Sequence, residues 1–508
     1  MNRWSALAGL LALAAALALR LPHLSVRPFH NDEGVNAIKV TELWQTGRYK
    51  YDPDEYHGPT LHYATLPFLW ASGARAAGDL KDSTLRLAPV FFGAGIILLL
   101  FLLRDGLGAR ALGWAAIFIA VSPAMVFYSR YFIHEIPLIF FTALTIGAGW
   151  RYSRSHSLFW AALAGAGVAL MYATKETFVI SVAAMAGALA LTLWRAKPSD
   201  WRVFFSWRAL SVAFGSAAIV WLLFFSSFFT NFGGLLDSIR TYFPWLKRAG
   251  GHSPHIHPWN FYFERLVWFH PVKGPAWSEA FILVMAIIGG FVSFRRKEPL
   301  HCFLTIYTLL VTLAYTAISY KTPWCLLNFW FGMLLLAGVG AAALTGLSKH
   351  LLPRIGTVVL LAVFTMQLAW QAWRASFVYA SDRRNPYIYA QTSADLLNLV
   401  SKVEDIARVA PGGFETVVKV IAPDGDYWPL PWYLRRFKNV GWYDALPQDP
   451  FAPMIIVSSQ LEARLDDKSE KKWIMVGYTE LRPRNFLELY VELELWKKYV
   501  ETLPRERE

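Results

Sequence analysis

Asp32 and Glu33 are adjacent carboxylates that follow the first long apolar stretch of the chain. Carboxylates at a membrane boundary are costly to desolvate unless they are paired, hydrated or bound to metal. One of them could accept a proton from an acceptor hydroxyl while the other tunes its pKa or holds a metal ion, and Gly34 would let a ligand approach the backbone closely. Alternatively, Asn31 and Asp32 cap a helix that begins near Val35. The pattern predicts a general base at one of these two carboxylates, and capping is the competing interpretation.

A second polar cluster contains Arg130, Tyr131, His134 and Glu135. Arg130 and His134 are four residues apart, as are Tyr131 and Glu135, so a helical continuation would group them by face. An arginine offers a rigid fork of donors that suits phosphate. The alternative is an ion pair between Arg130 and Glu135 that only pins two helices together.

Lys321 is an isolated cation between two apolar segments and could act as a point charge for a phosphate leaving group. Snorkelling of its long side chain toward water is the alternative. Lys175 and Glu176 are also neighbours at a turn between apolar segments. We expect these two to form a local ion pair.

Histidines are concentrated in two further stretches. His252, His255, His257 and His270 lie among aromatic residues between 231 and 276, and His57 lies in an acidic stretch after the first apolar segment. They could bind a metal ion or act as acids and bases, but an aromatic lid at the membrane surface is the simpler interpretation of the long loop. A divalent metal ion therefore stays an open possibility, with Glu33, His57, Glu135, His255 and His257 as candidate ligands.

The composition predicts that these polar residues are positioned by transmembrane helices. Of the 508 residues 55% are hydrophobic and 17% are charged, which is typical of a membrane protein. The net charge of +13 does not indicate a nucleic-acid partner, because the lysines and arginines cluster in alternate short loops. About eleven transmembrane helices are predicted. They cover residues 5–19, 84–103, 110–128, 133–150, 158–174, 177–194, 209–230, 277–294, 302–319, 324–346 and 355–373.

The distribution of basic residues also predicts the orientation. With a cytoplasmic N-terminus, most lysines and arginines of the short loops lie inside, as the positive-inside rule requires. The outer loops 23–83 and 231–276, Lys321 and the C-terminal tail then lie on the extracytoplasmic face of the plasma membrane. Segments 35–47 and 60–76 are predicted to lie along the interface. A cleaved signal peptide is the alternative for residues 5–19.

After Trp373 the composition becomes that of a soluble domain. Residues 391–409 have helical spacing, and residues 416–421, 454–458 and 473–477 are typical of short buried strands. The prediction is an all-α polytopic membrane domain, residues 1–380, followed by a small extracytoplasmic α/β domain, residues 381–508.

The order of these motifs resembles that of the GT-C membrane glycosyltransferases. An Asp-Glu pair follows the first span, a Ser-Arg turn ends in an acid before the fourth, and Lys-Thr-Pro lies near a late hairpin. The nearest branch is that of the protein O-mannosyltransferases and aminoarabinose-lipid A transferases. Within it, the runs YDPDEYHGPTLHY and DYWPLPWYLR resemble the flippase activity-associated proteins of archaea and bacteria.

The resemblance implies a sugar donor carried on a polyprenyl phosphate, transfer with inversion, and no nucleotide cofactor. It implies Asp32 as general base with Glu33 beside it, Arg130 and Lys321 as phosphate contacts, and Glu135 as an acid of the second loop. His134 and Tyr131 are further active-site candidates. The chain departs from the aminoarabinose transferases where their Glu-Lys-Pro is replaced by His57-Gly58-Pro59, which leaves His57 as a metal ligand or acceptor contact.

The C-terminal domain lacks the β-trefoil insert of the eukaryotic O-mannosyltransferases, so the acceptor could be a lipid, a glycan or a protein. Two other functions compete with transfer. A flippase or flippase-accessory protein would hold the lipid-linked sugar without chemistry, but the charges lie at the ends of the spans and not along a path through the bilayer. A nonenzymatic envelope scaffold would leave the outer cations without a ligand.

Overall fold

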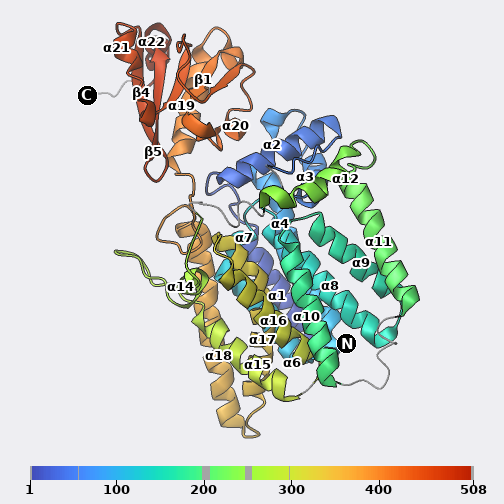
Figure 1. The fold of residues 1–508 in the computed structure, drawn as a ribbon. Helices are drawn as coiled ribbons and strands as arrows, with labels where there is room; N and C mark the ends of the chain where they lie inside the picture. The colour runs from blue at the N-terminus through green and yellow to red at the C-terminus, as the bar shows by residue number, and fades with distance from the viewer. Residues whose placement is uncertain (1–2, 55–56, 197–205, 246–254, 297, 505–508) are drawn as a thin grey trace. The chain divides into compact units, whose positions relative to one another are not determined.

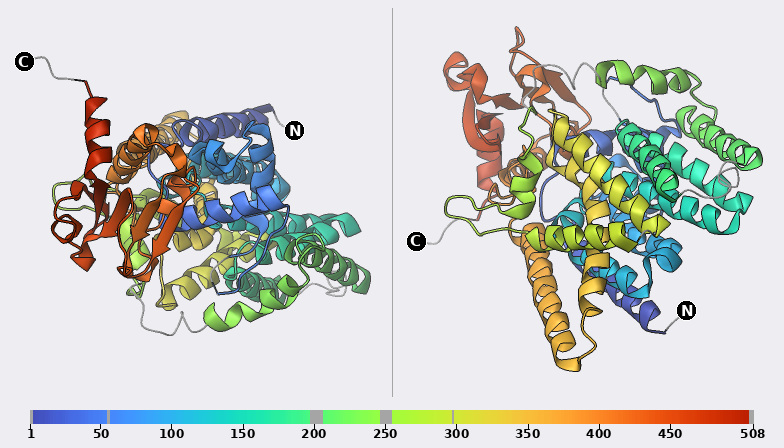
Figure 2. Two further views of the ribbon diagram at one scale, coloured as in Figure 1. Left: turned by 90° about the horizontal axis from the view of Figure 1, so that it is seen from above. Right: turned by 60° about the horizontal axis from the view of Figure 1, so that its bottom comes forward.

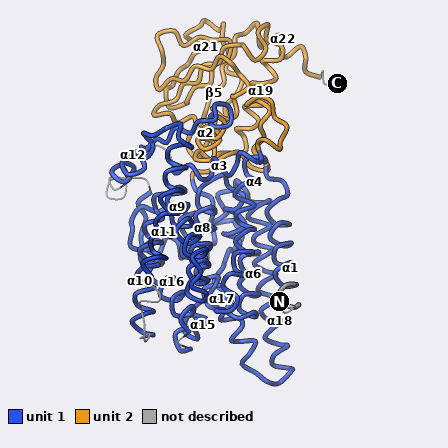
Figure 3. The backbone as a smooth tube through the Cα atoms, turned by 90° about the vertical axis from the view of Figure 1, so that its right-hand side faces the viewer, with its two compact units in different colours: residues 1–24, 42–68, 83–389 blue, residues 25–41, 69–82, 390–508 orange. Residues whose placement is uncertain are grey.

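The computed structural model describes residues 3–54, 57–196, 206–245, 255–296 and 298–504. These residues form two compact units, each drawn from three stretches of the chain (Figure 3). Unit 1 comprises residues 1–24, 42–68 and 83–389, and unit 2 comprises residues 25–41, 69–82 and 390–508. The candidate general base therefore belongs to the same unit as the C-terminal domain.

Unit 1 is built of helices, and each of the predicted spans is helical in it (Figures 1 and 2). The shorter elements α3 Thr60–Ala71, α7 Pro123–Tyr128, α12 Gly233–Arg240 and α14 Phe261–Val267 lie between the long helices. The long helices are α1 Arg3–Arg20, α4 Asp82–Leu99, α6 Ala109–Val121, α8 Glu135–Ser155, α9 Leu158–Tyr172, α10 Phe178–Ala196, α11 Trp207–Phe225, α15 Ala280–Arg296, α16 Pro299–Ala317, α17 Leu327–Thr345 and α18 Leu351–Trp373.

Several of these helices are long and apolar enough to cross a membrane, so the chain is a multi-pass membrane protein. Within the described ranges six helical stretches qualify, and three further apolar helices are shorter, so the predicted number of eleven spans is not confirmed. The predicted span 110–128 is divided into α6 and α7, because Pro123 begins a new helix that Ser122 caps. The six stretches are Asp82–Leu107, Phe178–Ala196, Trp207–Phe225, Pro299–Ala317, Pro323–Thr345 and Leu351–Val378.

Helix α17 forms the centre of unit 1. Every residue from Leu327 to Ala341 is buried, and the helix packs against α6, α15 and α16. Its contact with α15 depends on glycine, since a Cβ on Gly289 would collide with the Leu336 carbonyl and one on Gly340 with the Met285 carbonyl. Small residues let membrane helices approach this closely.

Unit 2 contains a five-stranded sheet in the order β2-β1-β3-β5-β4 (Figure 1). The central strand β3, Met454–Ser458, is completely buried and pairs in parallel with β1, Val418–Ile421. Helix α19, Asp395–Val409, packs on β4, Trp473–Arg482, and on α22, Leu493–Glu501. The predicted helix and three strands are confirmed.

The sequence analysis missed β2, Val440–Tyr443, and β5, Asn485–Glu492. Strand β2 is only four residues long and half-buried, so no apolar run identifies it. Strand β5 has Glu488 and Glu492 among its apolar residues, and it pairs antiparallel with both β3 and β4. The domain boundary predicted at 380/381 stays a prediction, since unit 2 also takes in residues 25–41 and 69–82.

Candidate active site

The carboxylate pair lies in the first turn of α2, Asn31–Thr46. His30 precedes the helix and its carbonyl accepts the Gly34 N–H, at 2.9 Å, so His30 is the N-cap. The Glu33 carboxylate reaches back to accept the His30 N–H, with Oε2 3.0 Å away, as in a capping box. The His30 Nδ1 accepts the Asp32 N–H at 3.2 Å. The alternative that Asn31 and Asp32 cap a helix near Val35 is wrong, because α2 begins at Asn31 and its cap is formed by His30 and Glu33.

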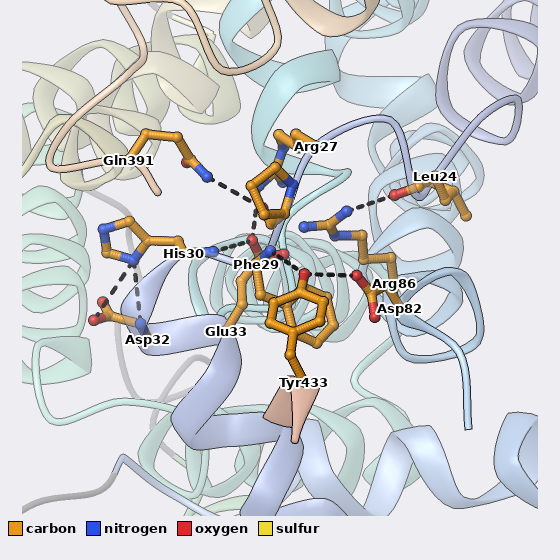
Figure 4. A network of polar contacts seen from close by, with 11 residues as sticks. Leu24, Arg27, Phe29, His30, Asp32, Glu33, Asp82, Arg86, Gln391 and Tyr433 are labelled. Atoms are coloured by element: carbon orange, nitrogen blue, oxygen red, sulfur yellow. Dashed lines mark hydrogen bonds and ion pairs between the residues drawn. The ribbon is translucent and has the colours of Figure 1, made fainter. Parts of the chain in front are cut away.

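The two carboxylates have different surroundings within unit 2 (Figure 4). Glu33 is completely buried and forms an ion pair with Arg27, with 2.7 Å between Oε2 and Nη1. The Asp32 side chain is 44% exposed and lies 3.7 Å from the His30 ring. Burial lowers the pKa of His30 although Asp32 and Glu33 favour its charged form, so His30 is neutral at neutral pH. Asp32 is therefore the member of the pair that an acceptor could reach.

Arg130 holds the end of α1 in unit 1. Its guanidinium donates to the carbonyls of Arg20, Pro22 and His23 at 2.7 to 2.9 Å and packs on the Phe377 ring. The alternative of an Arg130 to Glu135 ion pair is wrong, because the guanidinium satisfies the free carbonyls of a helix terminus instead. The phosphate contact proposed for Arg130 stays a prediction.

His134 and Glu135 start α8 and contact other polar groups. The Nε2 of His134 is 3.2 Å from the Gly58 carbonyl oxygen, and Glu135 forms a buried ion pair with Lys175. Tyr131 is buried and packs on the rings of Phe127 and Tyr128.

The prediction of a local ion pair between Lys175 and Glu176 is wrong. Lys175 pairs with Glu135, while Glu176 accepts from the His57 Nδ1 at 2.7 Å and from the Tyr51 hydroxyl at 3.1 Å. Adjacent side chains at a turn project in different directions, so each one pairs across the fold. Burial alone would raise the pKa of Glu176, but the nearby His57 outweighs it and lowers that pKa.

Lys321 lies in unit 1, in a segment that pairs with residues 255–257. Residues 255–257 and 319–321 run antiparallel, with the Lys321 N–H 2.8 Å from the His255 carbonyl. The Lys321 side chain is buried and its ammonium donates to the Ile318 and His257 carbonyls. Burial lowers the pKa of Lys321, and among the described residues no carboxylate lies within ion-pair distance of it.

Arg265, in α14, is a second, half-buried cation of this region that sequence reasoning missed. Its guanidinium lies over the Phe261 ring at 3.7 Å and donates to the Phe261 carbonyl. Burial lowers the pKa of Arg265. Burial and then the charges of Arg265, His255 and Lys321 lower the pKa of His257. The Lys321 ammonium contacts the His257 carbonyl, and Arg265 and His257 both pack on the Phe261 ring. Arg265 directly follows Glu264 in an aromatic stretch, so it does not stand out as a lone cation between apolar segments as Lys321 does.

Tyr389 connects the two histidines of this region. Its hydroxyl lies 2.7 Å from the His255 Nδ1 and 3.2 Å from the His257 Nε2. His257 also stacks on Phe261. His270 stacks near Trp268, and His252 lies outside the described residues. We name Lys321, Arg265, His255, His257 and Tyr389 the cationic cluster.

The candidate metal ligands are each engaged by a different partner. Glu33 pairs with Arg27, Glu135 with Lys175, His57 with Glu176, and both His255 and His257 with Tyr389. Within the described part of the chain, no three His, Cys, Asp or Glu side chains are grouped so that they could hold a metal ion. The described side chains at these positions do not fit a metal centre.

Structural comparison places this architecture among known proteins. ArnT from Cupriavidus metallidurans, in the apo state, aligns with a TM-score of 0.65 at 15% identity, over 96% of this chain and 97% of that chain. The chain has the GT-C fold. The oligosaccharyltransferase AglB from Archaeoglobus fulgidus, in complex with an inhibitory peptide and a dolichol-phosphate, aligns with a TM-score of 0.60 at 12% identity, over 98% of this chain and 77% of that chain.

Sequence comparison gives a narrower match. The family model described as dolichyl-phosphate-mannose-protein mannosyltransferase matches residues 62–236, about a third of the chain. The matched part includes the turn with Arg130 and Glu135 and the Lys175-Glu176 pair. No curated protein matches the chain by sequence.

Proposed function

We propose that the protein transfers a sugar from a polyprenyl-phosphate donor to an acceptor hydroxyl on the extracytoplasmic side of the plasma membrane. The observation that carries this proposal is the cationic cluster, in which Lys321 is buried and Arg265 is half-buried, and among the described residues neither has a carboxylate at ion-pair distance. A buried cation is costly unless an anion approaches it, and a lipid phosphate is the anion available at a membrane surface. A structure of ArnT bound to undecaprenyl phosphate has the same fold, with a TM-score of 0.59.

Transfer requires a base and a stabilised leaving group. Asp32 takes the proton from the acceptor hydroxyl as its oxygen attacks the anomeric carbon of the sugar. The bond from that carbon to the phosphate oxygen breaks, its electron pair leaves with the polyprenyl phosphate, and the configuration at the carbon inverts. Lys321 and Arg265 stabilise the negative charge that develops on the phosphate.

The other residues of the site support these two groups. Glu33, paired with Arg27, fixes the first turn of α2 so that Asp32 keeps its position. His57 is 42% exposed, and its contact with Glu176 would orient the ring toward a sugar or acceptor hydroxyl. Arg130 is the weaker of the two predicted phosphate contacts, because backbone carbonyls occupy three of its N–H donors.

The chemistry of the donor sets the partners. The sugar of a polyprenyl-phosphate donor is already activated by its bond to phosphate, so no nucleotide cofactor is required. The donor reaches the protein through the lipid bilayer. The acceptor is a lipid, a glycan or a protein; one structure of the Archaeoglobus fulgidus oligosaccharyltransferase holds a tethered acceptor peptide. The N-terminus is cytoplasmic and the C-terminal domain extracytoplasmic in this proposal.

The test uses purified full-length protein with a panel of polyprenyl-phosphate sugars and measures both lipid binding and release of polyprenyl phosphate. We expect the wild-type protein to release polyprenyl phosphate and Asp32→Asn to release none, while both proteins bind the donor. Asp52→Asn is a matched control, since Asp52 lies in the same outer loop and only accepts a turn hydrogen bond from Asp54 N–H. Binding without release would favour a flippase or flippase-accessory protein, and absence of binding would favour a scaffold.

A further inference from the structure

The stretch 426–435, DYWPLPWYLR, contacts the segment that carries the candidate base, and both belong to unit 2. The Tyr433 hydroxyl accepts the Phe29 N–H at 2.7 Å and donates to Asp82 Oδ2 at 2.9 Å (Figure 4). The Trp432 indole donates to the other oxygen of Asp82 at 2.7 Å. Asp82 thus fixes Tyr433 in the orientation that receives the Phe29 N–H.

Two further contacts hold the same segment. The Gln391 side-chain amide donates to the Pro28 carbonyl at 3.1 Å. A Cβ added to Gly34 would lie only 2.6 Å from the Pro429 Cβ and 3.2 Å from its Cα, so the space beside Gly34 is filled by Pro429 and not kept for a ligand. Only glycine permits this approach at position 34. The C-terminal domain therefore holds the backbone on both sides of Asp32, at Pro28 and Phe29 before it and at Gly34 after it.

The contacting stretch is itself braced by the sheet. Arg482, the last residue of β4, forms an ion pair with Asp426 and donates to the Trp428 carbonyl at 2.9 Å. Asn485, the first residue of β5, also donates to Asp426. Side chains held by packing and by a further layer of hydrogen bonds keep a catalytic group in its productive geometry.

We propose that the C-terminal domain positions the general base, with Tyr433 as the principal positioning residue and Pro429 and Gln391 as its supports. The inference rests on the proposed function, since it assigns these residues a role in placing Asp32 for proton transfer. It gives the domain a part in the reaction itself, separate from any recognition of the acceptor.

Tyr433→Phe tests the proposal, because it removes one hydroxyl and keeps the ring that packs beside Phe29. We expect kcat to fall about 10- to 100-fold, the range that a displaced catalytic group costs, while the affinity for the lipid donor is unchanged. Hydrogen exchange of the Phe29 amide should accelerate, because this N–H loses its partner. Tyr427→Phe is the matched control: it removes a hydroxyl from the same stretch, where the ring stacks on Trp442, and should change neither quantity.

A second variant separates positioning from folding. In an Asp32→Glu background the carboxylate is already displaced, so adding Tyr433→Phe should lower kcat by less than it does in wild type. If the Tyr433 contact is only structural, Tyr433→Phe should lower kcat and donor affinity together, and by the same factors in the wild-type and Asp32→Glu backgrounds. That result would overturn the proposal. Unchanged kcat or unchanged exchange at Phe29 in Tyr433→Phe would overturn it as well.

Failure of the proposed function gives a different result. In that case wild type itself releases no polyprenyl phosphate from any donor, and Asp32→Asn behaves as wild type does. The exchange measurement at Phe29 does not depend on activity, so it reports the Tyr433 contact in either case.

Discussion

Asp32 and Glu33 are consecutive residues, yet the side chain of Asp32 is 44% exposed and that of Glu33 is completely buried against Arg27. The first turn of α2 produces this difference, because Glu33 reaches back to the helix cap while Asp32 projects away from it. The pair is therefore divided between an accessible carboxylate and a structural one.

This division predicts opposite effects of two isosteric substitutions. Asp32→Asn should abolish transfer and leave the melting temperature unchanged, since its carboxylate has no ion pair at hydrogen-bonding distance. Glu33→Gln leaves Arg27 buried without its counter-charge and should cost about 3 kcal/mol of stability. Thermal unfolding in detergent, together with a transfer assay on the folded fraction, measures both. Equal destabilisation by the two variants would contradict the division.

The parts of the fold that depend on local sequence could be predicted. The predicted spans are helical, although 110–128 is divided into α6 and α7, because a continuous apolar stretch is sufficient to specify helix in a membrane. Asp32 and Lys321 could be selected as candidates because charges next to apolar stretches stand out in the sequence, and their roles stay predictions. The strands β1, β3 and β4 were visible as apolar runs, whereas β2 and β5 depend on pairing with neighbours for their burial.

Pairings between distant residues could not be predicted. Lys175 precedes Glu176 in the sequence, but its partner is Glu135, 40 residues earlier. Likewise, nothing local indicates that Phe29 meets Tyr433, which is 404 residues away. Such contacts are set by helix packing and domain topology, so a single sequence contains no local signal for them.

The cationic cluster leads to a prediction about donor binding. Lys321→Ala and Arg265→Gln should each weaken binding of a polyprenyl-phosphate sugar about 10- to 100-fold, the value of one or two charge-assisted hydrogen bonds. Lys273→Ala is the control, since Lys273 is an exposed lysine of the outer loop 231–276, which also contains Arg265. Binding to purified protein at fixed ionic strength is the measurement. Equal affinity of Lys321→Ala and Lys273→Ala would contradict the assignment.

The lowered pKa of Lys321 predicts how donor binding depends on pH. Burial shifts this pKa below the ordinary value of 10.5, and a bound phosphate would raise it again by favouring the ammonium. Affinity should therefore be full below the pKa of the free protein and fall as pH rises through it, starting below pH 10.5. Lys321→Arg should remove this decline, because arginine keeps its charge. A decline that persists in Lys321→Arg would assign it to another group.

The buried pair of Lys175 and Glu135 leads to the last prediction. The attraction of Glu135 outweighs the effect of burial and raises the pKa of Lys175, so the Lys175 ammonium stays charged at neutral pH. Removing one partner, as in Lys175→Met or Glu135→Gln, leaves a buried charge and should cost about 3 to 5 kcal/mol. The double variant with Lys175→Met and Glu135→Leu should regain most of this loss, because no charge then remains buried. Thermal unfolding of the two single variants and the double variant gives the coupling energy, and additive losses would show that the two residues act independently.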